Sequence, residues 1–331
     1  MPFVEVNNLT KYFPVQKSFL DTMLSGQKEF VRAVDGISFA VNRGETFGLV
    51  GESGSGKTTT GRMLVRLIEP TSGEIKFDGQ NPMKVGSEEL RQFRRRAQII
   101  FQDPAAALNP RMTVGQAIKH ALDIHRVGSQ ADRKEEVTKT LKRVGLSPPE
   151  NFYNKYPHQL SGGQRQRVVI GRAIILRPEF VVADEPVAMV DVSIRAQILD
   201  LMVSLKQELG LTYVFITHDL ATASYFCDRI AIMYLGRIVE VGLKKEVFKT
   251  PKHPYTKALI SAIPVPDPKH RPERQIPRGE IPSPINPPTG CRFHPRCPMV
   301  FDRCSKEEPG MIRLSDTHYV ACHLFDGPAS S

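Results

Sequence analysis

Eight residues, Gly51 to Thr58 with the sequence GESGSGKT, constrain the fold of this chain more than any other stretch. They fit the pattern G-x-x-x-x-G-K-[ST], they follow the apolar run Thr46 to Val50, and they precede a helix-like segment from Thr59 to Leu67. In that context the glycines let successive backbone N–H groups turn toward one anion, and the helix start adds the positive end of its dipole. The sequence therefore predicts a phosphate-binding loop in which Lys57 reaches the β- and γ-phosphates and the hydroxyl of Thr58 holds Mg²⁺.

Length and composition indicate a globular protein of roughly two domains. The 331 residues are 40% apolar and 24% charged, which are ordinary values for folded proteins. The N-terminus has no basic segment followed by an apolar run, and no apolar stretch approaches the ~20 residues that span a bilayer, so we expect a soluble, cytosolic chain. The net charge of +10 favours anionic partners such as nucleotides, nucleic acid or an acidic membrane face, without choosing among them.

Short strands are expected in the first hundred residues, and a polar residue follows one of them. Alternating apolar residues predict strands at Phe3 to Val6 and Ile37 to Val41, joined by a long polar connection from Val15 to Val31. A further apolar strand, Gln98 to Phe101, ends at Gln102. Open α/β sheets place ligand groups at the carboxyl ends of their strands, so Gln102 is a candidate site residue.

A second helix start also has the features of an anion-binding site. After a block of helical periodicity from Met112 to Asn154, which predicts an inserted helical subdomain, the sequence Leu160-Ser-Gly-Gly-Gln164 opens an amphipathic helix. Ser161 is expected to be the N-cap, so the two glycines expose backbone N–H groups. If the two anion sites lie at different ends of one subunit, nucleotide is enclosed only where two subunits meet head to tail.

Paired acids end the next buried strand, Phe180 to Asp184. At such a position the carboxylate of Asp184 suits Mg²⁺ coordination through water, and that of Glu185 suits polarising a water for in-line attack on a γ-phosphate. Beside a phosphate loop, this function is a better interpretation than two surface acids at a strand end.

Two more candidate residues follow. Asp191 lies in the turn before a predicted helix, and the buried strand Tyr213 to Thr217 delivers His218 to the carboxyl edge of the sheet. Because Gln102 and the paired acids are expected at that same edge, a contact from His218 to the γ-phosphate is predicted.

The composition changes beyond Thr250, where prolines exclude a continuous helix or central strand and predict a stiff linker. Four of the five cysteines lie in the last 41 residues, a density that favours metal or cluster ligation over disulfides in a reducing cytosol. Their spacing matches neither zinc ribbons nor ferredoxins, so the residues alone leave a [4Fe–4S] cluster, zinc and unligated thiols open. The four are Cys291, Cys297, Cys304 and Cys322. The fifth, Cys227, is expected in the core.

Taken in order, these motifs make the chain resemble an ABC transporter ATP-binding subunit over about residues 1–250. The tail sequence Gly290-Cys-Arg-Phe-His-Pro-Arg-Cys-Pro298 and the phrase His253-Pro-Tyr-Thr-Lys-Ala-Leu259 are similar to dipeptide/oligopeptide permease ATPases. The resemblance implies an α/β fold of the ABC type, with a RecA-like P-loop core, an antiparallel β subdomain and a helical subdomain at about residues 104–178. Residues 251–331 would form a proline-rich linker and a small cysteine-containing C-terminal extension.

The resemblance also implies roles for individual residues. Glu185 would be the general base, with Lys57, Gln102 and His218 completing the catalytic set. The implied ATP-binding residues are Tyr12, Phe13, Gly51, Glu52, Ser53, Gly54, Ser55, Gly56, Lys57, Thr58, Thr59, Gln102, Ser161, Gly162, Gly163, Gln164 and Asp191. In this set Tyr12 and Phe13 pack on adenine, Ser161 and Gly163 reach the nucleotide of the opposing subunit, and Asp191 bridges the dimer. The implied Mg²⁺ residues are Thr58, Gln102 and Asp184, and the four tail cysteines bind a [4Fe–4S] cluster in some relatives.

The implied function is ATP hydrolysis coupled to import of di- or oligopeptides, at the cytoplasmic face of the membrane as a peripheral subunit. Partners would be a second ATP-binding subunit, two membrane-spanning permease subunits and, indirectly, an external solute-binding protein. Alternatives are import of oligosaccharide or nickel by the same family, or a soluble ABC-type ATPase acting on nucleic acid. The last would usually carry tandem cassettes, coiled-coil arms or DNA-reading zinc modules, and none is visible, so no nucleic acid partner is expected.

One departure from the family pattern concerns the dimer-bridging turn. The usual Ser-Ala-Leu-Asp is here Ala188-Met-Val-Asp191, so a serine hydroxyl is missing from that turn. No catalytic position is degenerate, and this subunit is expected to contribute competent halves to both ATP sites.

Overall fold

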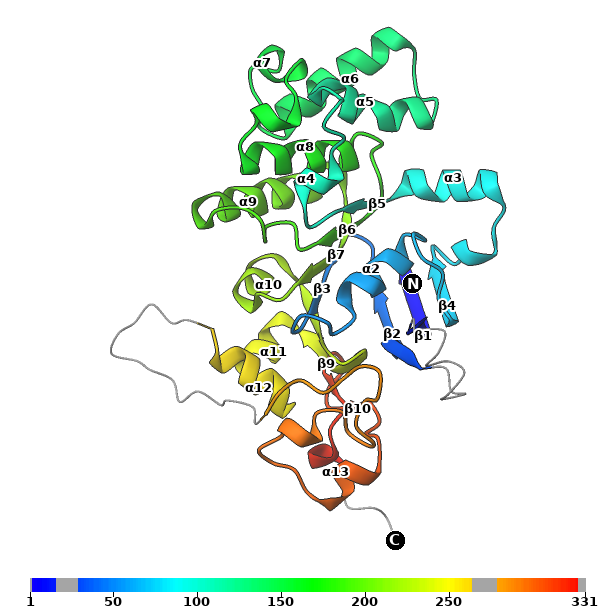
Figure 1. The fold of residues 1–331 in the computed structure, drawn as a ribbon, viewed down its shortest axis with the longest axis vertical. Coiled ribbons are helices and arrows are strands. Elements are labelled where there is room, and N and C mark those ends of the chain that lie inside the picture. The colour runs from blue at the N-terminus through cyan, green and yellow to red at the C-terminus, as the bar shows by residue number, and fades with distance from the viewer. Residues whose placement is uncertain (1, 16–28, 264–278, 327–331) are drawn as a thin grey trace, which may run out of the picture. The chain divides into compact units, whose positions relative to one another are not determined.

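The computed structural model describes residues 2–15, 29–263 and 279–326. Several of the prolines of the predicted linker, from Pro264 to Pro277, lie outside these described residues. The chain divides into two compact units (Figure 1). The first comprises residues 1–41, 46–81 and 217–331, and the second comprises residues 42–45 and 82–216.

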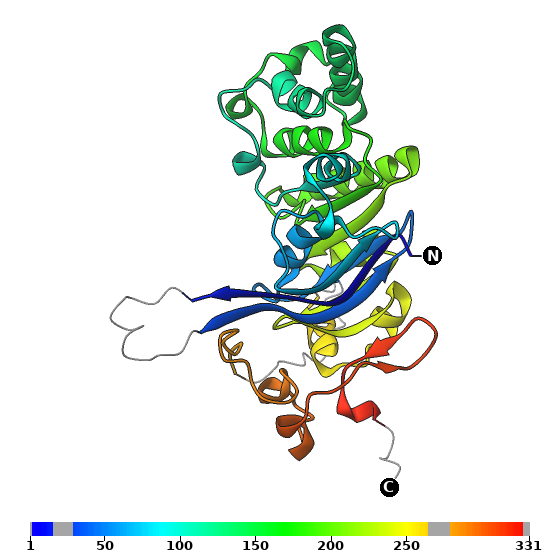
Figure 2. The same ribbon diagram turned by 90° about the vertical axis from the view of Figure 1, so that its right-hand side faces the viewer.

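An antiparallel sheet of the first unit has the strand order β2-β1-β4. Figure 2 shows the long pair formed by β1 and β2. Its strands are β1 (Val4–Pro14), β2 (Phe30–Val41) and β4 (Ser72–Phe77). The sequence predicted only a short first strand and a polar connection reaching Val31. That prediction is wrong at its edges, because cross-strand pairs such as Phe13↔Val31 continue the ladder far beyond Val6.

A second group of neighbouring strands in this unit has the order β10-β11-β9-β8-β3. The strands are β3 (Thr46–Val50), β8 (Arg229–Tyr234), β9 (Arg237–Leu243), β10 (Ile312–Arg313) and β11 (Tyr319–Val320). β3 and β8 are parallel and the other pairs are antiparallel. Every residue of β3 is buried, which explains its uninterrupted apolar sequence. β8 and β9 form an antiparallel hairpin that turns at Leu235 and Gly236.

The helices of the first unit flank these strands. They are α2 (Lys57–Leu64), α10 (Leu220–Phe226), α11 (Lys244–Lys249), α12 (Pro254–Ser261) and α13 (Asp302–Lys306), with the short 3₁₀ helices η3 (His294–Arg296) and η4 (His323–Phe325). Cys227 follows α10 and is buried, which confirms its predicted place in the core.

The second unit contains three parallel strands in the order β7-β6-β5, namely β5 (Ala97–Ile100), β6 (Phe180–Asp184) and β7 (Thr212–Thr217). Its helices are α3 (Ser87–Arg96), α4 (Pro104–Ala107), α5 (Val114–Ile124), α6 (Gln130–Arg143), α7 (Glu150–Tyr153), α8 (Gly162–Ile174) and α9 (Val192–Leu209), with 3₁₀ turns η1 (Pro82–Lys84) and η2 (Pro157–Gln159). α5, α6, α7 and α8 pack on one another through the apolar faces that the 3.6-residue periodicity predicted, including Ile118 and Leu141.

The C-terminal region joins the first unit through buried aromatic and charged groups. Phe293 is 1% exposed, and its ring centroid lies 5.3 Å from those of Tyr234 and Tyr255. The fully buried carboxylate of Glu240, on β9, accepts hydrogen bonds from the backbone N–H of His253 and from the ring of His318. Burial alone would raise the pKa of Glu240, but its hydrogen bonds, which also include one from the backbone N–H of Lys252, outweigh burial and keep the pKa below its usual value.

In the described part of the chain, no helix combines the length and the apolar character that crossing a membrane requires.

Phe293 generates a stability prediction. Phe293→Ala removes a fully buried ring and leaves a cavity, so we expect the free energy of unfolding to fall by about 3–5 kcal/mol. Phe301→Ala, in the same region but 42% exposed, is the matched control and is expected to change stability by about 0.5 kcal/mol or less. Urea unfolding followed by tyrosine fluorescence measures both. Equal effects of the two substitutions would contradict the anchoring role of Phe293.

Candidate functional site

The predicted phosphate loop is present as a strand–loop–helix unit that encloses an ammonium group. Lys57, the first residue of α2, is 4% exposed. Its Nζ donates hydrogen bonds to the carbonyl oxygens of Gly51 at 2.7 Å and Glu52 at 2.9 Å, and to Oγ of Ser55 at 3.3 Å. The positive charge is therefore held inside the ring of the loop, next to the helix start whose free N–H groups favour an anion.

Close backbone packing shapes the loop. Gly56 has φ of 103°, in the left-handed region, and a Cβ placed there would lie 2.2 Å from the carbonyl oxygen of Ala33 on β2. A Cβ at Gly51 would lie 2.2 Å from the carbonyl oxygen of Met233. Only glycine fits at these two positions, and this is the physical reason for two of the invariant letters of the motif. Ser53 and Gly54 form the exposed tip, and Thr58 and Thr59 are half-buried on the first turn of α2.

The two predicted adenine-binding aromatics lie near the end of β1 with different surroundings. The hydroxyl of Tyr12 donates a hydrogen bond to the carboxylate of Asp35. Phe13 is 37% exposed, with the ammonium of Lys11 5.2 Å from its ring centroid. Burial and the hydrogen bond to Asp35 both raise the pKa of Tyr12. Tyr12 is thus held by a hydrogen bond, whereas the ring of Phe13 is partly exposed and lies beside the Lys11 ammonium.

Sequence reasoning missed the contacts that the C-terminal region makes with this loop. Arg296 forms a two-pronged ion pair with Glu52, Nη1 to Oε2 at 2.9 Å and Nη2 to Oε1 at 3.3 Å. The backbone N–H of Glu52 donates to the hydroxyl of Tyr255 at 3.0 Å. Arg292 donates to the carboxylate of Asp35. The tail motif contained both arginines, but no spacing in the sequence indicated which acids they pair with.

In the second unit, the structure brings two predicted catalytic residues together. Nε2 of Gln102, after β5, donates to Oε2 of Glu185, after β6, at 3.0 Å. Asp184 ends β6 and is 2% exposed. Glu185 has φ of 46°, a left-handed conformation, and its N–H donates to the carbonyl of Ile216 at 2.9 Å. The turn therefore directs the carboxylates of Asp184 and Glu185 differently. Such a difference is what separate roles in Mg²⁺ binding and in polarising water would require.

The second helix start has the predicted cap. Oγ of Ser161 accepts from the N–H of Gln164 at 3.3 Å, and the Gln164 side chain accepts from the N–H of Ser161 at 3.1 Å, a complete capping box. Gly162 is exposed, and a Cβ at Gly163 would lie 2.7 Å from the side chain of Ile194 on α9. The serine–glycine cap thus lies beside the start of α9, where Asp191 is the exposed N-cap residue.

The predicted site residues are thus divided between the two units. The first unit holds Tyr12, Phe13, the loop Gly51 to Thr58 with Thr59, and His218, which is exposed after β7. The second unit holds the remaining members: Gln102, Ser161, Gly162, Gly163, Gln164, Asp184, Glu185 and Asp191.

The four tail cysteines are close enough to influence one another. Burial raises the pKa of Cys291 to about 12 and that of Cys322 to about 11, and the neighbouring thiols add to both shifts. Backbone N–H groups of Phe293 and Leu324 act in the opposite direction. In the described residues, no group of three or more His, Cys, Asp or Glu is arranged to hold a metal ion. The predicted [4Fe–4S] ligation therefore finds no support in the arrangement of the described residues.

The loop glycines generate a second prediction. Gly56→Ala must relieve a contact with the Ala33 carbonyl as well as the strain of a positive φ, so we expect it to weaken Mg²⁺–triphosphate binding strongly and to cost about 1–3 kcal/mol of stability. Gly54→Ala, with φ of 78° but open space around its Cβ, is the matched control and should bind better than Gly56→Ala. Titration calorimetry and urea unfolding compare the two. Indistinguishable affinities would show that the Ala33 contact does not shape the loop.

Comparisons with known proteins agree along the chain. The ABC transporter family profile matches residues 34–188, and the profile for the oligopeptide/dipeptide transporter C-terminal region matches residues 239–304. The chain is 49% identical to a peptide import ATP-binding protein of Brucella ovis, over 97% of each chain. It is 45% identical to the oligopeptide transport ATP-binding protein AppF of Bacillus subtilis, also over 97% of each.

Solved structures show the same fold. A dimeric ATP-binding cassette in a post-hydrolysis state, bound to ADP and Pi, has a TM-score of 0.63 at 30% identity, covering 73% of this chain and 98% of that one. The cbiO1 protein of Clostridium perfringens, part of the ABC transporter complex cbiONQ, has a TM-score of 0.63 at 28% identity, covering 75% of this chain and 91% of that one. The chain therefore belongs to the ABC transporter family, as an ATP-hydrolysing, ATP-binding subunit with the C-terminal region of oligopeptide/dipeptide transporters.

Proposed function

We propose that this chain is the ATP-hydrolysing subunit of an importer for di- or oligopeptides or a related solute. The observation that carries the proposal is the 45–49% identity to ATP-binding proteins named for peptide transport. The alignment spans 97% of the chain, so it includes both the phosphate loop and the C-terminal region. The geometry of the loop and of the Gln102–Glu185 contact supports nucleotide hydrolysis as the chemistry.

The proposed roles follow the placement of the side chains. The Lys57 ammonium and the loop N–H groups bind the β- and γ-phosphates, and Tyr12 with Phe13 packs on adenine. Thr58, Gln102 and Asp184 would hold Mg²⁺, which would neutralise charge on the phosphates. Glu185 takes the proton of the attacking water, with Gln102 orienting its carboxylate, and His218 contacts the γ-phosphate. The whole ATP-binding set is the one named from the sequence.

A second ATP-binding subunit is part of the proposal, because the serine–glycine cap needs an opposing phosphate loop to act on nucleotide. The apolar side chains of Met189, two residues before Asp191, and Val192, directly after it, are 60% and 77% exposed. Exposed apolar groups beside a functional turn favour burial against a partner. That partner is a second copy of this chain or a sister ATP-binding chain.

The remaining partners are two membrane-spanning permease subunits and, through them, an external solute-binding protein. This assembly would hold the chain at the cytoplasmic face of the membrane as a peripheral subunit. Oligosaccharide or nickel as the cargo remains an alternative within the same family. Action on nucleic acid is not proposed, because the relatives compared are named for transport.

We also propose the domain organisation expected from the sequence. Residues 1–250 form the ATP-binding cassette, with a helical subdomain at about residues 104–178. The packing of α4 to α8 on one another supports that subdomain. Residues 251–331 form the linker and the C-terminal extension.

The general-base assignment generates the third prediction. Glu185→Gln keeps the shape and the Gln102 contact but loses the proton acceptor, so turnover should fall by roughly 10² to 10⁴ while ATP binding is kept. Glu179→Gln is the matched control. Glu179 lies directly before the first residue of β6, at the end opposite to Glu185, and pairs with Arg43 and Arg96. Phosphate release and ATP titration measure both variants.

The same variants test transport. Reconstituted with its permease subunits and a solute-binding protein, the unaltered chain should support ATP-dependent peptide uptake, and Glu185→Gln should not. Near-normal hydrolysis by Glu185→Gln would overturn the assignment of the base. Hydrolysis that DNA stimulates, with no uptake, would overturn the transport proposal.

A [4Fe–4S] cluster on the tail stays a prediction. Four gathered thiols favour it, and the lack of a metal-holding arrangement in the described residues counts against it. The fourth prediction is that anaerobically purified protein contains ~4 iron and ~4 sulfide atoms per chain, as a cluster of this type requires. A Cys291→Ser/Cys297→Ser variant should lose both. An iron content that is the same in this variant would show that these cysteines do not hold a cluster.

A further inference from the structure

Two elements of the C-terminal region meet at one residue of the phosphate loop. Glu52 follows the first loop glycine, and its carboxylate pairs with both terminal nitrogens of Arg296. Its backbone N–H donates to the hydroxyl of Tyr255 on α12. Side chain and main chain of one loop residue are thus both fixed from a part of the sequence more than two hundred residues away.

Arg296 itself is held rigidly. It lies on η3, in a turn that closes through hydrogen bonds from the N–H of His294 to the carbonyl of Cys291 and from the N–H of Cys297 to the carbonyl of His294. Its guanidinium carbon lies 5.8 Å from the ring centroid of Tyr234 and 6.0 Å from that of Phe293. The Arg296 side chain is only 8% exposed, against 29% for Glu52. The arginine is the fixed partner, and the loop residue is the one that it orients.

The contact continues to the phosphate-binding lysine. The carbonyl oxygen of Glu52 accepts from Nζ of Lys57 at 2.9 Å. A shift of the Glu52 peptide therefore moves one of the oxygens that place the ammonium. The guanidinium of Arg296 also neutralises a carboxylate that would otherwise repel the phosphates of bound nucleotide.

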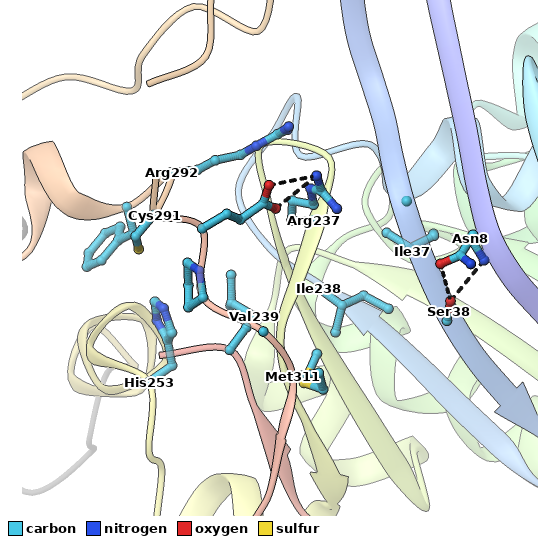
Figure 3. A pocket seen from close by; sticks show the side chains of 16 residues that line it. Asn8, Ile37, Ser38, Arg237, Ile238, Val239, His253, Cys291, Arg292 and Met311 are labelled. Atoms are coloured by element: carbon cyan, nitrogen blue, oxygen red, sulfur yellow. Dashed lines mark hydrogen bonds and ion pairs between the residues drawn. The ribbon is translucent and has the colours of Figure 1, made fainter. Parts of the chain in front are cut away.

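The same turn reaches the aromatic end of β1. Arg292 donates hydrogen bonds to the carbonyl of Leu235 and to the carboxylate of Asp35, which in turn accepts from the hydroxyl of Tyr12. The positive charges of Arg292 and Arg237 help to keep the pKa of Asp35 below its usual value against the effect of burial. Arg292, Cys291 and Ile37 of β2 line a pocket with a volume of about 500 Å³. Figure 3 shows these side chains.

The two contacts belong to one corner of the first unit. Tyr12 is the cross-strand partner of Arg32, and the next residue of β2, Ala33, is the one that packs on Gly56 of the loop. The turn from Cys291 to Cys297 thus touches both the phosphate-binding and the aromatic side of this corner.

We propose that this turn, with Tyr255, is a positioning element of the ATP site. Arg296 and Tyr255 fix Glu52 and through it the phosphate loop, and Arg292 fixes Asp35 and through it Tyr12. The inference rests on the proposed role of Gly51 to Thr58 as the phosphate site. A preformed loop binds its ligand without the entropy cost of ordering. The turn and Tyr255 therefore act on nucleotide affinity more than on the rate of the chemical step.

The test uses the full-length chain with Mg²⁺ and two probes, ATP and inorganic tripolyphosphate, which lacks adenine. Arg296→Gln is expected to weaken binding of both by about 10- to 150-fold, the range for a lost hydrogen-bonded charge partner. Arg296→Lys keeps the charge but not the two-pronged geometry, so its affinity for both probes should lie between those of the unaltered chain and Arg296→Gln. Arg313→Gln is the matched control, because Arg313 is in the same region but 61% exposed and pairs with Asp316. It should leave both affinities unchanged.

The second arm has its own signature. Asp35→Asn is expected to weaken ATP binding while leaving tripolyphosphate binding unchanged, because only the aromatic side of the site is affected. In the assembled ATPase, Arg296→Gln should raise KM for ATP with a smaller effect on kcat. Tyr255→Phe removes just the hydroxyl that accepts from Glu52, and should weaken both probes by about 2- to 10-fold even if Arg296→Gln does not fold.

Urea unfolding of each variant separates local from global effects. Unchanged affinities in both Arg296→Gln and Tyr255→Phe would overturn the inference, as would an equal loss in Arg313→Gln. Lys57→Ala tests the phosphate site separately from the positioning role of the turn. If Lys57→Ala still binds ATP normally, the phosphate-site assignment fails. If Lys57→Ala loses ATP binding while Arg296→Gln and Tyr255→Phe keep it, only the positioning role fails.

Discussion

A ring of backbone around one buried ammonium is the constraint on which the rest of this structure depends. The loop must bring several N–H groups and Lys57 to one point, and it does so by passing within contact distance of two neighbouring main chains. Gly56 lies against the carbonyl of Ala33, and Gly51 lies against that of Met233. The strands that carry those carbonyls, β2 and β8, must therefore be placed accurately, and their buried residues do this work.

Charge is ordered around that ring in layers. The Lys57 ammonium is held by loop oxygens, the Glu52 carboxylate lies outside it, and the Arg296 guanidinium is outermost and buried against aromatic rings. Each charge has its partner before a nucleotide arrives, so binding needs little rearrangement of the loop. The net positive charge of the chain is consistent with an anionic ligand, but local pairing decides where that ligand is held.

Much of the candidate site could be predicted because strand ends and helix caps are local features. The contact between Gln102 and Glu185 follows from two parallel strands, β5 and β6, that end at the same edge. The cap at Ser161 follows from one serine three residues before a glutamine. The predicted cluster on four cysteines found no such support, since cysteine density gives no information on where the sulfur atoms point.

The sequence by itself determined the phosphate loop, the order of the catalytic motifs and the apolar strands, because each depends on residues close together in the chain. It misjudged the length of β1 and β2, whose pairing is set by register between segments rather than by composition. Only the tertiary structure decided that Arg292, Arg296 and Tyr255 meet Asp35 and Glu52. Those contacts join residues more than two hundred positions apart, and a charged side chain carries no local signal of which opposite charge it will pair with.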